Sequence, residues 1–179
     1  KYDHVTEFNR NPVDQALKWE AMGAKLLHIV DLDGARTGRP TNNDSIKSIR
    51  DKVKIPIQIG GGVRTEERAE ELIEIGINRV IVGTMAIEEP QTIEKLSYKY
   101  PNRIILGIDA KNGKVATRGW IKENETKANE LIKNFSNSNI ASIICTDIST
   151  DGTLKGPNLD FLKEMALASK IPVIASGGI

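Results

Sequence analysis

Apolar residues along the chain fall in short runs of strand length, separated by longer segments in which apolar and polar residues alternate with helical spacing. Two of the apolar runs are close copies: residues 55–63 read IPIQIGGGV and residues 171–179 read IPVIASGGI. Each has a proline near its start, is almost wholly apolar, and carries a glycine pair at its end. This pattern is typical of a strand that is buried on both faces of a parallel sheet.

The similarity between these two runs extends to a longer repeat. When the sequence is shifted by 116 positions, residues 28–63 match residues 144–179 at ten positions without a gap. The shared residues include Asp31 with Asp147, Asn42 with Asn158, Asp44 with Asp160, and the glycine pairs Gly61-Gly62 and Gly177-Gly178. The chain therefore contains a duplicated unit, which constrains the fold more than any single element.

The remaining pattern predicts strands and helices in strict alternation. Asn11-Pro12, Thr65 and Pro90 are typical helix starts, and Asp44 is expected to cap another helix. The first helix should present Val13, Ala16, Leu17 and Met22 to the core. Residues 31–43 and 150–158 are expected to be loops, and Asn112-Gly113 predicts a small hairpin. Strands are expected at residues 26–30, 55–59, 79–82, 104–108, 142–146 and 171–175, with further helices at 129–135 and 159–168.

Alternating strands and helices indicate parallel strands joined by right-handed crossovers. An open doubly wound sheet and a closed barrel both satisfy this. The repeat spans four strand–helix units, so two copies give eight, the number that closes a (β/α)8 TIM barrel. No Gly-x-Gly-x-x-Gly motif supports dinucleotide binding. We therefore expect residues 1–179 to form a single incomplete TIM-barrel domain of duplicated half-barrels, without the first strand and the last strand–helix unit.

Composition and charge exclude several functional classes. The chain is 39% hydrophobic and 27% charged, as in ordinary globular proteins, and its formal net charge of +1 argues against a nucleic-acid surface. The apolar runs are too short to span a membrane. A lone cysteine, Cys145, fits a reducing cytoplasm and is expected to be a buried strand residue rather than a nucleophile.

In a barrel of this kind the active site lies at the carboxyl ends of the strands. The glycines there, and Gly83-Thr84, let the backbone approach an anion closely; alternatively they only permit tight turns. Two symmetry-related pairs favour two phosphate sites and a ligand with a phosphate at each end. Residues that both halves share, such as Asp31 and Asp147, are expected to be structural. Asp109 directly follows an apolar strand and is not shared, so we expect a general acid or base, or else a loop cap.

Four segments in order carry a specific resemblance. They are residues 28–35 (HIVDLDGA), 58–64 (QIGGGVR), 108–117 (IDAKNGKVAT) followed by Gly119-Trp120, and TDI at 146–148 with DGTL at 151–154. Together they closely resemble the phosphoribosylformimino-aminoimidazole carboxamide ribotide isomerases of histidine biosynthesis, over essentially the whole chain. The segment around Asp109 distinguishes them from the sister cyclase family on the same duplicated barrel.

This resemblance implies an Amadori rearrangement of a bis-phosphorylated aminoaldose to an aminoketose, with no metal or organic cofactor. Asp109 would be the general acid; the family's base is an aspartate on the first strand of the barrel, which would precede residue 1. The resemblance places the following residues at the substrate: Thr146, Asp151, Gly152, Gly119, Trp120, Arg64 and His28.

Each of these assignments has a structural alternative. Thr146 could satisfy a strand end, Asp151 a turn, and His28 its barrel neighbours, while Trp120 could be a rim aromatic and Arg64 a solvated arginine. The function also has alternatives: a dual-substrate isomerase that acts on phosphoribosyl anthranilate as well, or a non-catalytic binder of phosphorylated ligands. We expect a cytoplasmic monomer whose partner is a small molecule, neither nucleic acid nor membrane.

Overall fold

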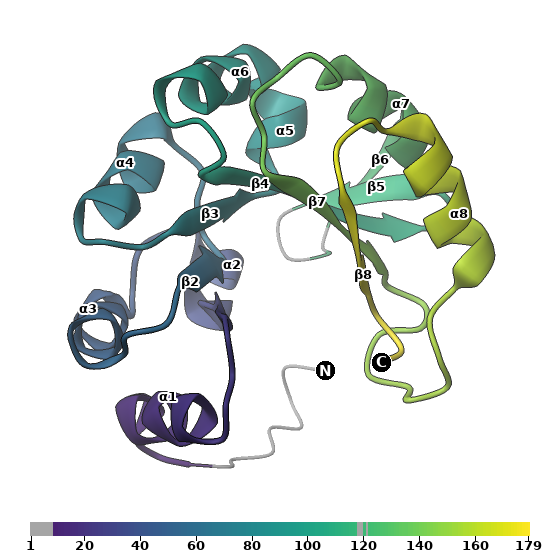
Figure 1. Ribbon diagram of the computed structural model, residues 1–179. Helices are drawn as coiled ribbons and strands as arrows, with labels where there is room; N and C mark the ends of the chain where they lie inside the picture. Colours follow the sequence, from purple (N-terminus) through teal and green to yellow (C-terminus); the bar gives the residue numbers. More distant parts are fainter. Residues whose placement is uncertain (1–8, 118–119, 121) are drawn as a thin grey trace.

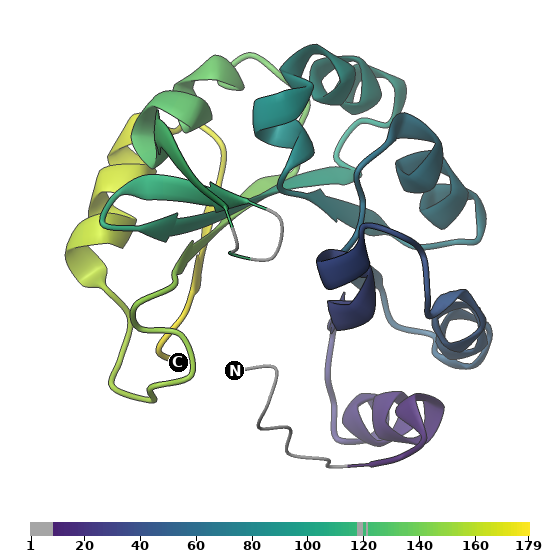
Figure 2. The same cartoon turned by 180° about the vertical axis from the view of Figure 1, so that it is seen from behind.

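The computed structural model describes residues 9–117, 120 and 122–179, whose strands form one curved sheet. The longer helices lie along the convex side of this sheet, whereas a short helix that directly follows the first strand lies inside this outer row (Figures 1 and 2). The strands are β1 (Leu27–Val30), β2 (Ile57–Gly60), β3 (Arg79–Val82), β4 (Ile104–Lys111), β5 (Lys114–Thr117), β6 (Lys122–Lys127), β7 (Ser142–Asp147) and β8 (Val173–Ser176). The helices are α1 (Pro12–Ala21), α2 (Leu32–Thr37), α3 (Asn43–Lys52), α4 (Glu66–Glu74), α5 (Met85–Glu88), α6 (Pro90–Lys99), α7 (Ala128–Asn134) and α8 (Leu159–Ala168).

Six of the strands are parallel and follow one another in the order β1-β2-β3-β4-β7-β8. This confirms the expected alternation and the α/β barrel architecture. Within the described residues the sheet is an arc rather than a closed ring, because β1 and β8 are edge strands that do not pair with each other. Because the six strands are parallel, their carboxyl ends all lie along the same edge of the sheet, at one end of the barrel axis.

The two remaining strands, β5 and β6, pair antiparallel as a hairpin, and a turn at Asn112-Gly113 joins β4 to β5. Asn112 and Gly113 have φ angles of 52° and 76°, as the predicted two-residue turn requires. β4 pairs with β3 only as far as Leu106, and beyond that point β5 pairs antiparallel with Asp109–Lys111. The hairpin thus occupies the position next to β4 that β3 leaves open, at the carboxyl end of the sheet.

The sequence repeat is also a structural repeat. α8 and β8 occupy the positions of α3 and β2 displaced by 116 residues, with identical lengths. In each half the amide Nδ2 of an asparagine donates a hydrogen bond to an aspartate at the end of the preceding strand. Asn42 lies 2.7 Å from Asp31, and Asn158 lies 2.6 Å from Asp147. These bonds confirm that the shared aspartates are structural.

The core lies between the convex side of the sheet and the helices. Ile57 and Ile59 of β2, Val80 of β3 and Leu72 of α4 are almost completely buried there. The cap residues are those that the sequence indicates: the side chains of Asn11 and Thr65 accept backbone N–H bonds at the starts of α1 and α4. No helix among the described residues is long and apolar enough to cross a bilayer.

Several details of the predicted elements were wrong. The loop expected at residues 31–43 contains α2, whose first turn is capped by the Asp31 carboxylate, and α5 and β6 were not predicted. The helix that Asp44 was expected to cap begins at Asn43, so Asn42 is at the N-cap position and Asp44 lies within the first turn. Met22 and Leu17 are exposed rather than buried, because nothing in the described chain covers that side of α1. β4 continues for two residues beyond Asp109, since pairing with β5 and β7 extends it.

Candidate active site

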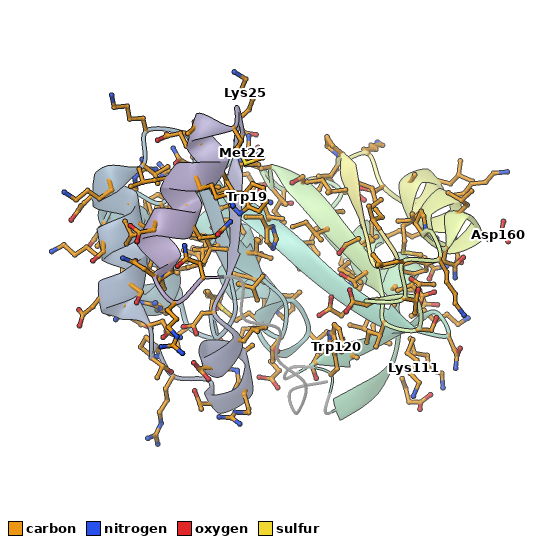
Figure 3. All side chains as sticks on the ribbon, turned by 90° about the horizontal axis from the view of Figure 1, so that it is seen from below. Trp19, Met22, Lys25, Lys111, Trp120 and Asp160 are labelled. Atoms are coloured by element: carbon orange, nitrogen blue, oxygen red, sulfur yellow. The ribbon has the colours of Figure 1, made fainter. Side chains whose placement is uncertain are left out.

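A cavity of about 580 Å³ opens at the carboxyl ends of the parallel strands. Residues from all six of these strands or the loops after them line it, together with residues of the β5–β6 hairpin. Figure 3 shows that Trp120 lies at this end of the molecule, whereas Lys25 and Met22 lie at the other. Ten residues singled out from the sequence line the cavity: His28, Gly61, Gly62, Arg64, Gly83, Thr84, Asp109, Trp120, Thr146 and Asp151.

The floor of the cavity exists because two glycines on the inner side of the sheet leave room for Ile81. A Cβ atom on Gly60 would lie 3.2 Å from Cβ of Ile81, and one on Gly107 would lie 3.1 Å from its Cγ2. Ile81 therefore fills the space between β2 and β4, and the cavity begins above it. This packing was not predicted from the sequence, since an isolated glycine in a strand pattern has several possible causes.

Asp109 lies in the cavity and has a pKa that its surroundings shift from the usual value of an aspartic acid. Its Oδ2 accepts a 2.8 Å hydrogen bond from Nε1 of Trp120, and the Thr146 hydroxyl donates to the same carboxylate. Burial raises the pKa of Asp109, and the negative charge of Asp151 adds to this effect, while the two hydrogen bonds oppose it. The net result is a raised pKa, so this carboxyl takes up a proton more readily than a solvated aspartic acid.

Register across three strands places Thr146 beside this acid and Ser176 beside Thr146. Asp109 of β4 pairs with Thr146 of β7, which pairs in turn with Ser176 of β8. Thr146 is 7% exposed and Ser176 lines the cavity. Ser176 was not singled out from the sequence. Its position directly before Gly177-Gly178 at a strand end was the available signal.

Gly61 and Gly62 occupy a turn that only glycine fits without strain. Their φ angles are 97° and 73°, and a Cβ atom on Gly61 would lie 2.2 Å from the carbonyl oxygen of Asp31. In the second half, Gly177 packs closely against the Asp147 backbone and Gly178 against the carbonyl of Gly156. Close packing of one loop on the next therefore explains both pairs, and Gly61 and Gly62 also line the cavity.

Three predicted glycines lie elsewhere. Gly177 and Gly178 are not among the residues that line the cavity, and neither is Gly152, which has a φ of 70° and open space around it. Gly119 lies outside the described residues. The glycine pair of the first half thus lines the cavity, whereas the pair of the second half does not.

Arg64 is anchored to the loop after β1 rather than free in solvent. Its Nη2 donates a 2.7 Å hydrogen bond to the carbonyl of Ala35, and the guanidinium packs against Gly38, where a Cβ atom would clash with it. Both Arg64 and Ala35 line the cavity. The guanidinium therefore combines a structural contact with a positive charge at the cavity wall.

His28 of β1 is paired with Gln58 of β2. The amide Nε2 of Gln58 lies 2.8 Å from Nδ1 of His28, and the two residues are register partners on neighbouring strands. Desolvation lowers the pKa of His28, so its imidazole is neutral at pH 7. The neighbour that satisfies this histidine is itself almost fully buried, with 4% of its surface exposed.

Other titratable groups have structural explanations. Burial would raise the pKa of Asp147, but hydrogen bonds from Ser149 and Asn158 outweigh it and lower the pKa. Cys145 is fully buried and burial raises the pKa of its thiol to about 12, which confirms the expectation of a core residue. Among the described residues, no three His, Cys, Asp or Glu side chains are grouped closely enough to hold a metal ion.

Comparison with known proteins agrees with this geometry. The family model "Histidine biosynthesis protein" matches residues 1–179. The chain belongs to this histidine biosynthesis family. A relative from Prochlorococcus marinus is 66% identical over 99% of this chain and 70% of its own length. A second strain of that species and a Synechococcus species have relatives at 60% and 57% identity, with the same coverage.

All three relatives carry the name 1-(5-phosphoribosyl)-5-((5-phosphoribosylamino)methylideneamino) imidazole-4-carboxamide isomerase. The resemblance inferred from four short segments is thereby confirmed across the whole chain. Membership of the histidine biosynthesis family also agrees with the (β/α)8-type order of strands and helices.

Proposed function

We propose that this chain provides the active site of an isomerase that converts the bis-phosphoribosyl aminoaldose named in its relatives into the corresponding aminoketose. The substrate and the product are isomers, so the reaction needs only proton transfers at specific atoms. A proton must reach the ring oxygen as its bond to C1 breaks, and a proton must leave C2 to give an enaminol. C1 must then gain a proton as the C2 hydroxyl loses one, which gives the ketone. General acid–base catalysis by positioned side chains is sufficient for each of these steps.

The observation that carries this proposal is the environment of Asp109. It has a raised pKa, it lies in the cavity, and two donors fix the orientation of its carboxylate. A general acid must hold its proton near neutral pH and deliver it to one atom, and these features favour both requirements. Asp109 would protonate the departing ring oxygen, with Thr146 positioning the reacting sugar beside it.

The cavity also suits the remainder of the substrate. Its volume of about 580 Å³ fits a small organic molecule, and the backbone turns at Gly61-Gly62 and Gly83-Thr84 open into it. N–H groups of such turns bind phosphate, and the Arg64 guanidinium adds a positive charge next to the first of them. We assign this wall to one phosphate. We assign the second phosphate to the turn at Gly177-Gly178 with Gly152, which is not part of the cavity wall but directly follows the wall residues Ser176 and Asp151 in the sequence.

Two further side chains would hold the middle of the substrate. Trp120 lines the cavity, and its indole ring is suited to stacking on the planar imidazole-carboxamide; Gly119 precedes it in the sequence. Asp151 lines the cavity on the side of β7. Proton removal from C2 requires a base in addition to Asp109, which the resemblance assigns to an aspartate on a strand that precedes β1 in the complete barrel. A monomeric state and a cytoplasmic location stay predictions.

Turnover of the named aminoaldose by the protein and its Asp109→Asn variant tests the proposal. We expect the variant to lose at least ~100-fold in kcat, the usual contribution of a general acid, and to keep its affinity for the substrate. Asp160→Asn is the matched control, because this exposed acid lies on α8, far from Trp120 in Figure 3. An Asp109→Asn protein as active as Asp160→Asn would contradict the proposal; a protein that binds the substrate without converting it would be a non-catalytic binder.

A further inference from the structure

The contact between Gln58 and His28 fixes more than the position of a side chain. Gln58 Nε2 is an amide nitrogen with two hydrogens and no lone pair to accept with, and it lies 2.8 Å from His28 Nδ1. Nδ1 must therefore be the acceptor, and a neutral imidazole that accepts at Nδ1 carries its proton on Nε2. Protonation of Nδ1 would set two N–H groups against each other, so this contact also disfavours the imidazolium.

The burial of Gln58 indicates that its contact with His28 lowers the stability of the folded protein. Its Oε1 is buried without a hydrogen-bond partner among the described residues. An unsatisfied buried polar atom typically destabilises a protein by ~1–3 kcal/mol. A methionine would fill the same space without that cost. The glutamine is therefore explained by what its Nε2 does at His28 rather than by stability.

The register of the strands determines on which side of the sheet the His28 ring and the Gln58 amide lie. His28 and Gln58 are paired neighbours on β1 and β2, so their side chains project to the same concave side of the sheet. His28 lines the cavity, whereas Gln58 does not. Nδ1 of the ring is thus in contact with Gln58, and we infer that Nε2, the other ring nitrogen of this cavity-lining residue, is available to a ligand.

We propose that Gln58 is a positioning residue of this site: its amide holds His28 in the Nε2–H tautomer, so that the imidazole presents a neutral hydrogen-bond donor to an oxygen of the substrate. This inference rests on the proposed isomerase function for the identity of the substrate, but not for the tautomer. A neutral donor fits an uncharged hydroxyl, ring or carboxamide oxygen. The phosphates are assigned to the glycine turns and to Arg64 instead. Gln58 acts only through His28 and does not touch the substrate itself.

Nitrogen NMR of histidine-labelled protein tests the tautomer directly, with the His28 signals assigned by their loss in His28→Asn. In the parent protein we expect an unprotonated Nδ1 and a protonated Nε2. Gln58→Met should give a mixture of tautomers, and Gln58→Glu should move the proton to Nδ1, since a carboxylate only accepts. Ser142→Ala is the matched control, because Ser142 is also buried on the concave side with a hydroxyl that has no partner among the described residues, and it is not in the cavity wall.

Kinetics provide the second readout. We expect Gln58→Met and Gln58→Glu to lower kcat/KM for the aminoaldose about tenfold, the value of one neutral hydrogen bond of ~1.4 kcal/mol, and Ser142→Ala to leave it unchanged. An Nδ1–H tautomer in the parent, or Gln58 variants with parental tautomer and kcat/KM, would overturn the inference. If the parent protein shows the Nε2–H tautomer but no turnover, the isomerase assignment fails and the role of Gln58 in fixing His28 stands.

Discussion

Nε1 of Trp120 donates a 2.8 Å hydrogen bond to Oδ2 of Asp109, so the aromatic residue of the hairpin is tied to the acid at the end of β4. This donor stabilises the carboxylate and lowers the pKa of Asp109, against the larger effect of burial. Trp120 thus influences the protonation of Asp109.

Trp120→Phe keeps an aromatic ring and removes only the donor. The pKa of Asp109 should rise further, because burial and Asp151 then act against one hydrogen bond fewer. A general acid works only when protonated, so the basic limb of the kcat/KM profile should move to higher pH. The measurement is that profile in parent and variant. A limb that stays in place or moves to lower pH would contradict the role of Asp109 as the acid.

Arg64→Met tests the charge at the cavity wall. We expect KM for the bis-phosphorylated substrate to rise at least tenfold, because a hydrogen bond to a charged group contributes ~1.5–3 kcal/mol. Stability should also fall slightly, through loss of the bond to the Ala35 carbonyl. Arg36→Met is the control, since Arg36 is exposed on α2 and pairs weakly with Asp33 at 4.0 Å. Equal KM values for the two variants would count against a phosphate at this wall.

Gly61→Ala separates two costs that a glycine avoids. At Gly113, with φ of 76° and open surroundings, alanine should cost only the left-handed backbone strain of ~1–2 kcal/mol. At Gly61, with φ of 97°, the new methyl group would also collide with the backbone of Asp31. We expect Gly61→Ala to lose at least ~2 kcal/mol more than Gly113→Ala in urea unfolding. Similar losses would show that the loop moves aside easily.

Asp109 and Asp147 should affect stability with opposite dependence on pH. The pKa of Asp147 is lowered in the folded state, so its contribution is present above the unfolded-state pKa of ~3.9 and is lost as the pH falls through the folded value. Asp147→Asn should therefore destabilise the protein at pH 7 and much less at pH 3.

The pKa of Asp109 is raised, so folding is most favoured when it is protonated, and that advantage is lost as the pH rises through the folded value. Asp109→Asn, a neutral analogue, should be more stable than the parent at pH 7 and equally stable near pH 3. Unfolding free energies at the two pH values measure both effects. A destabilised Asp109→Asn at pH 7 would show that the carboxylate is not strained by burial.

The parts of the fold whose signals are local were predictable from the sequence. The Asn112-Gly113 turn and the bounds of β3 and α8 agree with the structure because turn chemistry, apolar runs and caps specify them. α2 was missed because a helix this short has little intrinsic stability; it depends on the Asp31 cap and on the packing of Gly34 under Gly61-Gly62. Met22 was misplaced because helical periodicity shows an apolar face but not whether anything covers it.

Asp109 was singled out from its position at a strand end, whereas Thr146 was named only from the family resemblance; both line the cavity. Long-range packing was not predictable: the contact of Gln58 with His28 and the position of Ile81 between two glycines depend on strand register, which the sequence leaves open. The sequence repeat predicted that Gly177-Gly178 would correspond to Gly61-Gly62. Only the first pair lines the cavity, so the two halves differ at the cavity wall.

The paired bonds Asp31–Asn42 and Asp147–Asn158 enclose loops of equal length that have different conformations. One loop folds into α2, and the other forms irregular turns that carry Asp151. Because each bond fixes both ends of its loop to the barrel, the residues between them were free to change after the duplication without altering the frame. The two loops could therefore diverge in conformation and in the side chains that they carry, while the duplicated strands and helices around them kept the same arrangement.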